Sequence, residues 1–149
     1  MPTSRVLPPI FFLGSILLMV LLRFMFPGPQ WALTSGRAIG GFLLLLGILL
    51  NVMSARLFEK RGTAIKPFER SKALVVEGPY RFTRNPMYLG MLIILLGLGM
   101  LLGSTIPLLV IPVFLMLITT RFVLVEEHML AERFGKAYKE YSARVRRWL

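Results

Sequence analysis

The chain has 149 residues, of which 56% are hydrophobic, and its formal net charge is +11. Its apolar runs are too long for the core of a soluble domain of this size, so we predict a single integral membrane domain over residues 1–149. The absence of cysteine excludes disulfides, thiol catalysis and thiolate metal ligands. With a single histidine as well, no metal site is predicted.

The first half of the chain contains two predicted membrane spans. Residues 8–26 form an apolar segment that ends without a small-residue cleavage site, so we interpret it as a retained helix and not as a signal peptide. Residues 38–55 form the second span. Gly40, Gly41 and Gly47 lie within it and predict close packing against another helix.

The second half contains an apolar segment that must fold into a hairpin. No charged residue occurs between positions 84 and 121. A single helix over this stretch would be roughly 50 Å long at about 1.5 Å per residue, whereas the hydrocarbon core of a bilayer is about 30 Å thick. Because glycine and proline punctuate residues 103–107, we predict spans over 86–102 and 106–125. Pro112 is expected to kink the second of these.

Beyond the last span, residues 127–145 carry apolar side chains at spacings of three and four, which predicts an amphipathic helix on the membrane surface. The predicted fold class is therefore all-α, with four transmembrane helices and one cytoplasmic helix at the C-terminal end.

Basic residues gather in two segments, one between the second and third spans and one at the end of the chain. They are Arg56, Lys60, Arg61, Lys66, Arg70, Lys72, Arg81 and Arg84 in the first segment, and Arg121, Arg133, Lys136, Lys139, Arg144, Arg146 and Arg147 in the second. The positive-inside rule places both segments, and with them both termini, in the cytoplasm. The positive charge is thus attributed to topology and to anionic lipid, and no nucleic-acid partner is expected.

Polar groups flank the predicted hairpin. The run Arg84-Asn85-Pro86-Met87-Tyr88-Leu89-Gly90 begins it, and Glu126 and Glu127 follow it. Asn85 and Pro86 are typical of a helix N-cap and first position, which would offer free backbone donors and a positive dipole end to an anion. The two glutamates offer the opposite charge to a cation. We therefore predict a site for a charged ligand at the membrane surface.

The same motifs carry a family resemblance. They include Gly78-Pro79-Tyr80-Arg81 before the run described above, and Phe134-Gly135, Tyr138, Tyr141 and Arg147-Trp148 after the acid pair. In this order they resemble the C-terminal module of the membrane methyltransferase superfamily that contains isoprenylcysteine carboxyl methyltransferases and phosphatidylethanolamine N-methyltransferases. The resemblance implies that S-adenosylmethionine binds at the cytoplasmic ends of the last two spans. It also implies a lipid or hydrophobic acceptor from the bilayer, and we expect the cytoplasmic membrane of a bacterium or archaeon.

The resemblance assigns roles to individual residues. The cofactor-binding residues would be Arg84, Asn85, Pro86, Tyr88, Leu89, Gly90, Glu126, Glu127, Phe134 and Tyr138. Tyr88 would hydrogen-bond the ligand or the acceptor. Arg121 is the nearest candidate for the arginine that the carboxyl methyltransferases place before their acid pair, so Tyr88 and Arg121 are the predicted catalytic residues.

The methyl acceptor remains open between a carboxylate, an amine and a thiol. Isoprenylcysteine enzymes usually carry histidine where this chain has Asn85, whereas the phospholipid enzymes resemble the asparagine form. The phospholipid enzymes, however, carry a glycine pair where Arg61-Gly62-Thr63-Ala64 holds one glycine. Two other hypotheses are a membrane scaffold without activity and a sterol-reductase-like enzyme that uses NADPH. The sequence predicts no oligomeric state.

Overall fold

The computed structural model describes residues 7–26, 28–30, 34–62 and 73–149. Within these ranges the regular secondary structure is helical, with one isolated bridge between Gln30 and Ser104. Lys66, Arg70 and Lys72 of the first basic segment lie outside the described residues, as do Thr63 and Ala64, at the position where the phospholipid enzymes carry their glycine pair.

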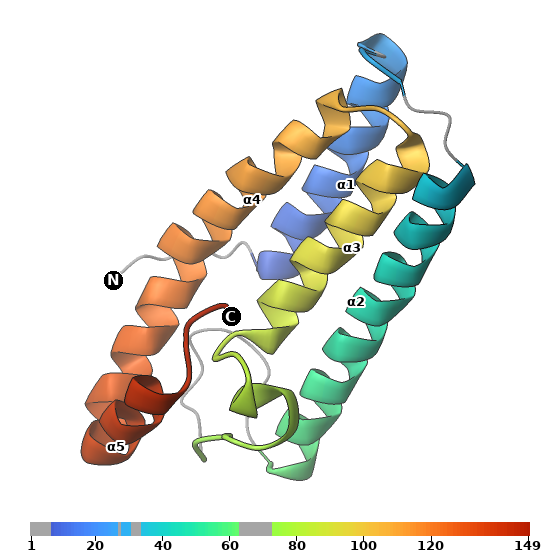
Figure 1. The fold of residues 1–149 in the computed structure, drawn as a ribbon. Coiled ribbons are helices and arrows are strands. Elements are labelled where there is room, and N and C mark those ends of the chain that lie inside the picture. Colours follow the sequence, from blue (N-terminus) through green and yellow to red (C-terminus); the bar gives the residue numbers. More distant parts are fainter. Residues whose placement is uncertain (1–6, 27, 31–33, 63–72) are drawn as a thin grey trace.

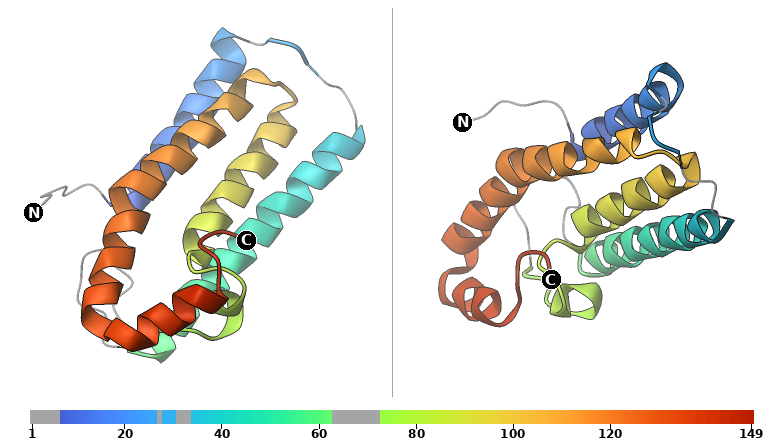
Figure 2. Two further views of the ribbon diagram at one scale, coloured as in Figure 1. Left: turned by 60° about the vertical axis from the view of Figure 1, so that its left-hand side comes forward. Right: turned by 45° about the horizontal axis from the view of Figure 1, so that its top comes forward.

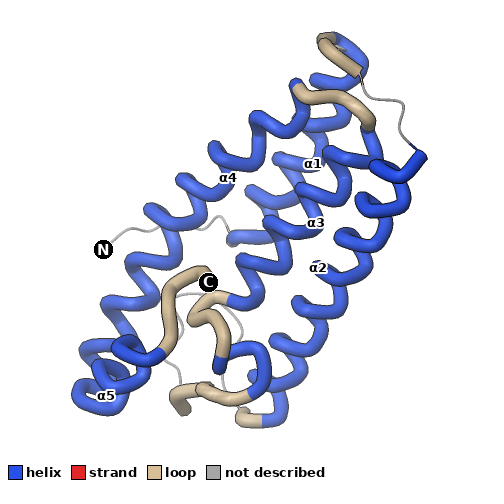
Figure 3. Tube along the Cα trace, in the orientation of Figure 1, coloured by secondary structure: helices blue, strands red, loops and turns tan. Residues whose placement is uncertain are grey.

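The helices run side by side as a bundle, with the connecting loops at its two ends (Figure 1, Figure 3). In chain order the elements are α1 (Pro8–Met25), α2 (Thr34–Lys60), the 3₁₀ turn η1 (Gly78–Arg81), α3 (Pro86–Leu102), the 3₁₀ turn η2 (Ile106–Leu109), α4 (Val110–Ile118), the π-helical turn η3 (Thr119–Val123) and α5 (Leu124–Arg144). The bounds of α3 match the predicted span of 86–102.

The outer surface of the bundle is apolar, as expected of a protein surrounded by lipid. Leu45 is 67% exposed, Leu13 62% and Met116 60%. The helices Pro8–Met25, Gly36–Lys60 and Thr105–Arg144 are long and apolar enough to cross a membrane, and Pro86–Leu102 is a shorter apolar helix. Large apolar side chains on the outside cost free energy in water, so the bundle belongs in a bilayer. The prediction of an all-helical membrane bundle is confirmed.

The second span is longer than the predicted range of 38–55. Helix α2 has 27 residues, which gives about 40 Å at roughly 1.5 Å per residue. This length exceeds the hydrocarbon core, so one end of the helix reaches past it. Its last turn carries Lys60, which is exposed.

The helical run continues through the boundary predicted between a fourth span at 106–125 and a separate helix at 127–145. The chain stays helical from Thr105 to Arg144, and the break within this run falls at Gly135, where φ is +48° and ψ is −115°. No glycine or proline occurs between positions 113 and 134, so nothing in the backbone interrupts the helix earlier. Beyond the break, α5 folds back across the end of the bundle (Figure 2, left).

The helical irregularity in the fourth span lies later than Pro112. Pro112 is the third residue of α4, which follows η2 without a break, and the chain stays helical through it. The hydrogen-bond pattern changes instead at η3, where Thr119 and Thr120 donate to carbonyls four residues earlier at 2.6 and 2.8 Å. Such side-chain bonds to the preceding turn compete with the backbone ladder and bend helices.

The buried core joins α1, α3 and α4. Met19, Leu95 and Ile118 are fully buried, and Phe114 is 1% exposed. The ring of Phe122 is also 1% exposed and lies edge-on to a ring of α1, with centroids 5.6 Å apart. This packing fixes the start of α3 relative to the end of the fourth span, which is where the predicted site residues lie.

Helices α2 and α3 approach each other at two pairs of glycines. A Cβ atom on Gly40 would lie 2.8 Å from the carbonyl oxygen of Gly97, and one on Gly47 would lie 2.7 Å from that of Gly90. These are closer than real Cβ contacts, so only glycine fits at this spacing. The predicted close packing is confirmed for Gly40 and Gly47. A Cβ atom on Gly41 would meet no described atom within 4 Å, so this glycine takes no part in the contact.

We therefore expect Gly47→Ala to lower the free energy of unfolding by about 1–3 kcal/mol, since the added methyl meets the α3 backbone. Gly41→Ala is the matched control, because it brings the same gain in helix propensity without a contact. The measurement is thermal unfolding of both variants in detergent. Equal effects of the two substitutions would contradict this packing.

Candidate functional site

The end of the chain docks against the segment that leads into α3. The backbone N–H of Arg84 donates to the carbonyl of Arg146 at 3.0 Å. The carbonyl of Arg147 accepts two side-chain bonds, from Thr83 Oγ1 at 3.0 Å and from Asn85 Nδ2 at 3.1 Å. Thr83 and Asn85 are 2% and 7% exposed. These bonds join residues more than 60 positions apart and hold the C-terminal segment at the start of α3.

A second set of contacts holds the folded-back part of α5. The hydroxyl of Tyr141 donates to the carbonyl of Tyr80 in η1 at 2.7 Å, and both tyrosines are buried. Burial raises the pKa of Tyr141 to about 12, so its hydroxyl stays a donor at ordinary pH. The ring of Tyr80 in turn lies 5.3 Å from that of Phe58 in α2. The docked helix therefore touches an element packed on α2.

Asn85 occupies the N-cap position of α3, as predicted, but its side chain does not cap the helix. The amide group bonds the Arg147 carbonyl instead, and the backbone N–H of Asn85 donates to Thr83 Oγ1 at 3.2 Å. Pro86 follows as a fully buried first helical residue. Leu89 donates its N–H to the Asn85 carbonyl at 2.9 Å, which closes the first helical turn. The first turn of α3 therefore has no side-chain cap on its N–H groups.

The first glutamate of the acid pair is bonded to α3. The hydroxyl of Tyr88 donates to Glu126 Oε1 at 2.6 Å, and Tyr88 is 8% exposed. An O–H donor on a carboxylate at this distance is a strong hydrogen bond. It joins the third and fourth predicted spans at the point where the sequence predicts a charged ligand.

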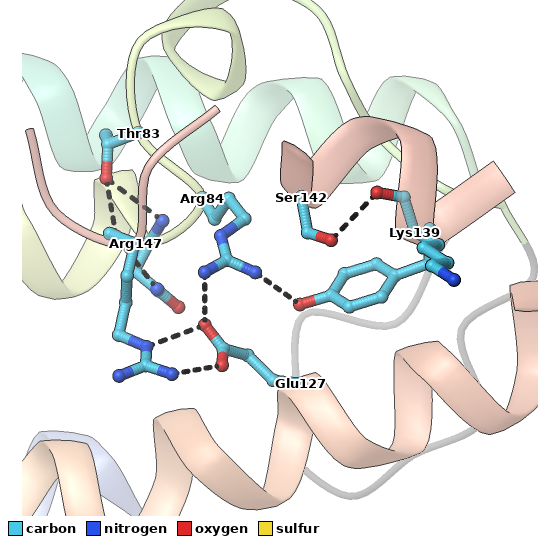
Figure 4. Close-up of polar contacts among 8 residues, drawn as sticks. Thr83, Arg84, Glu127, Lys139, Ser142 and Arg147 are labelled. Carbon is cyan, nitrogen blue, oxygen red and sulfur yellow. Dashed lines mark hydrogen bonds and ion pairs between the residues drawn. The ribbon is translucent and has the colours of Figure 1, made fainter. Parts of the chain in front are cut away.

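The second glutamate is shared by two arginines (Figure 4). Glu127 accepts from Arg147 Nε at 2.9 Å and from Arg147 Nη2 at 2.8 Å, one bond on each carboxylate oxygen. Arg84 Nη2 lies 3.3 Å from Glu127 Oε1, and Arg84 Nη1 donates to the hydroxyl of Tyr138 at 3.1 Å. The bond to Glu127 raises the pKa of Arg147. The side chains of Arg84 and Glu127 are each 15% exposed.

Three residues predicted for the site take no part in these contacts. The side chain of Arg121 is exposed on η3 and forms no hydrogen bond or ion pair with another described residue. Phe134 is half-buried, and the guanidinium of Arg133 lies 5.8 Å from the centre of its ring. Gly90 faces α2 at the glycine contact described above.

Two residues of the cluster were not assigned to the site from the sequence. Arg147 belongs to the family motif at the end of the chain, but nothing in its local sequence shows that it pairs with Glu127. Thr83 carries no distinguishing sequence signal at all. No group of three or more metal-ligating side chains occurs in the ranges that the structure describes.

The bond between Tyr141 and Tyr80 gives a stability prediction. Tyr141→Phe leaves a buried carbonyl without its donor, so we expect a loss of about 1–3 kcal/mol in the free energy of unfolding. Ser142→Ala is the control, since it removes only an exposed bond within α5. Chemical unfolding in detergent measures both, and a Tyr141→Phe variant as stable as the control would contradict the docking.

The fold has a counterpart of known structure. A solved structure of the eukaryotic intramembrane Ras methyltransferase ICMT, isoprenylcysteine carboxyl methyltransferase, matches 92% of this chain and 50% of that chain, with a TM-score of 0.71 at 24% sequence identity. The helices and the charged cluster at their end thus define a membrane protein with the fold of an intramembrane methyltransferase. The phospholipid methyltransferase family profile matches residues 36–137, and the chain belongs to that family.

Curated relatives extend this result. The chain is 35% identical over 72 residues to the protein-S-isoprenylcysteine O-methyltransferase of Schizosaccharomyces pombe, covering 48% of this chain and 30% of that protein. It is 35% identical over 77 residues to protein-S-isoprenylcysteine O-methyltransferase B of Arabidopsis thaliana, covering 52% of this chain and 39% of that protein. An uncharacterized protein of Haemophilus influenzae is 38% identical over 63 residues, which is 42% of this chain and 100% of that protein. The resemblance seen in the sequence is confirmed, and the matches span less than half of the two named enzymes.

Proposed function

We propose that this protein transfers a methyl group from S-adenosylmethionine to a lipid or hydrophobic small-molecule acceptor at the cytoplasmic face of the membrane. The observation that carries the proposal is the meeting of opposite charges from two distant segments. Arg84, just before α3, pairs with Glu127 of α5, and the adjacent Glu126 is bonded to Tyr88 of α3. These four side chains form the charged corner. Both segments lie at the end of the bundle that also carries Lys60 and η1.

The residues at this corner suit a zwitterionic donor. S-adenosylmethionine supplies a methyl group on a cationic sulfonium, and its amino-acid end carries an ammonium and a carboxylate. On the anion-binding side, Arg84 Nε is buried without a hydrogen-bond partner among the described residues, and the N–H groups of the first turn of α3 have no side-chain cap. On the cation-binding side, only one oxygen of Glu126 is bonded within the described chain, by Tyr88.

The side chains at this corner would bind the donor and the acceptor, orient them toward each other and exclude water. Such alignment of two reactants can contribute about 7–11 kcal/mol to lowering a barrier. Tyr88 fixes the Glu126 carboxylate from α3, and Tyr138, whose hydroxyl meets Arg84, would cover the nucleoside together with Phe134. A carboxylate acceptor needs no general base, whereas a protonated amine must first lose a proton. Arg121, exposed on η3, would contact the acceptor.

A shallow, open depression between α2 and η1 would suit an amphipathic acceptor. It has a volume of about 280 Å³ and is lined by Met53, Arg56, Leu57, Lys60, Gly78 and Pro79. The apolar side chains suit a hydrocarbon tail, and the two cations suit an anionic or polar head. Gly78 and Pro79 belong to η1, which lies just before the charged corner in the chain.

Binding of the donor tests the proposal directly. We expect wild-type protein in detergent to bind S-adenosylmethionine with micromolar affinity, and Glu126→Gln to weaken binding about tenfold, the loss of roughly 1.4 kcal/mol for a charge contact. Glu132→Gln is the control, because Glu132 is 68% exposed and its described ion pair is with His128 on its own helix. Isothermal titration measures all three.

The same titration separates the rival functions. Binding of NADPH in place of S-adenosylmethionine would support a reductase, and binding of neither would support a scaffold without activity. An unchanged affinity in Glu126→Gln would remove Glu126 from the site.

The nature of the acceptor gives a second test. If the acceptor enters from the bilayer, turnover should rise with the length of its hydrocarbon chain, because each buried methylene contributes about 0.8 kcal/mol. Transfer of a labelled methyl group to a long-chain acceptor and to its truncated soluble analogue, both at low concentration, measures the difference. Equal turnover of the two would argue for a soluble acceptor.

A further inference from the structure

The Glu127 cluster contains more positive than negative charge. Two guanidinium groups, those of Arg84 and Arg147, contact the single carboxylate of Glu127. The two bonds of Arg147 and the contact of Arg84 occupy three of the roughly four lone-pair sites of the Glu127 carboxylate, so little capacity is left for another cation. Around Glu127 itself, two positive charges therefore face one negative charge.

Both guanidinium groups of this cluster also have an N–H donor without a partner among the described residues. Arg84 Nε is buried and has no hydrogen-bond partner among the described residues. The third nitrogen of the other guanidinium, Arg147 Nη1, has no partner within the described chain. Glu126 is the other acid at the corner, and its described bond goes to Tyr88. A partly buried guanidinium with free donors is costly unless an anion completes it.

The backbone around Arg147 is held in place by the contacts of the C-terminal segment. Its carbonyl accepts from Thr83 and from Asn85, both buried. The Arg147 side chain is 38% exposed, against 15% for Arg84, so it lies at the open side of the cluster. A ligand that arrives from solution would meet the Arg147 guanidinium first.

We propose that Arg147 and Arg84 together bind the carboxylate of the donor's amino-acid end, and that Glu127 is the counterion that positions the two guanidiniums. This inference rests on the proposed function and deepens it. It replaces the expectation from the sequence that both glutamates offer their charge to a cation of the ligand, and it leaves Glu126 as the acid for the cationic part. Asn85 and Thr83 act as positioning residues for Arg147.

The test compares two ligands that differ in one group. S-adenosylhomocysteine carries both the ammonium and the carboxylate, and its decarboxylated analogue keeps the amine and lacks the carboxylate. We expect Arg147→Gln to weaken the binding of S-adenosylhomocysteine at least about tenfold, because hydrogen bonds between charged groups are lost. The affinity for the decarboxylated analogue should stay within about twofold of wild type. Isothermal titration of detergent-purified protein gives both affinities.

Two further variants make the result specific. Arg146→Gln is the matched control, since Arg146 is the neighbouring arginine and contributes its backbone carbonyl to the docking. It should leave both affinities unchanged. Arg147→Lys keeps the charge and loses the bidentate geometry, so it should bind S-adenosylhomocysteine with an affinity between those of wild type and Arg147→Gln. Thermal unfolding of each variant shows whether the fold is retained.

Each outcome decides the proposal. Equal weakening of the two ligands by Arg147→Gln would assign Arg147 a purely structural role and overturn the inference, and so would unchanged binding of both. If Arg147→Gln does not fold, the intermediate effect of Arg147→Lys on S-adenosylhomocysteine alone carries the same test. A wild-type protein that binds neither ligand overturns the proposed function, and with it this inference. If the wild-type protein binds both ligands but Arg147→Gln does not selectively weaken the binding of S-adenosylhomocysteine, only this inference is overturned.

Discussion

The docking of the C-terminal segment onto the start of α3 is the contact on which the candidate site depends. Thr83 and Asn85 hold the carbonyl of Arg147, and the N–H of Arg84 holds that of Arg146. These buried bonds would cost several kcal/mol if left unmade, because each polar group has been removed from water. Without them the guanidinium of Arg147 would not reach Glu127, and Glu127 at the charged corner would lack one of its two arginines.

Rigid packing on either side of that contact keeps the corner in one geometry. The glycine pairs Gly40–Gly97 and Gly47–Gly90 lock α3 onto α2, and the bond from Tyr88 to Glu126 ties α3 to α5. A membrane bundle gains little from the hydrophobic effect between its helices, so close packing and hydrogen bonds of this kind must hold it together. The result is a preorganised set of opposite charges at the end of the helices, which suits a zwitterionic methyl donor.

Much of the fold follows from local sequence. The apolar runs predict the membrane spans, and the bounds of α3 follow from Pro86 at its start and Gly103 just after its end, where φ is +64°. The break in the last helix was misplaced because a change from apolar to charged residues near Glu126 resembles a boundary. A change in composition does not interrupt backbone hydrogen bonds, and the helix continues to Gly135, where the backbone can adopt positive φ.

The sequence by itself determined that this is a membrane bundle, which residue types flank its last hairpin, and that acids and cations meet somewhere at one end. Only the tertiary structure decided which acid pairs with which partner: Tyr88 with Glu126, and Arg84 and Arg147 with Glu127. The tertiary structure also decided that the Asn85 side chain donates to the Arg147 carbonyl and does not cap α3. The physical reason is that these partners lie 20 to 62 positions apart, so no local propensity sets their pairing. The contacts of Glu126 and Glu127 with α3 depend on the hairpin between α3 and α4, and those of Arg147 depend on the fold-back at Gly135.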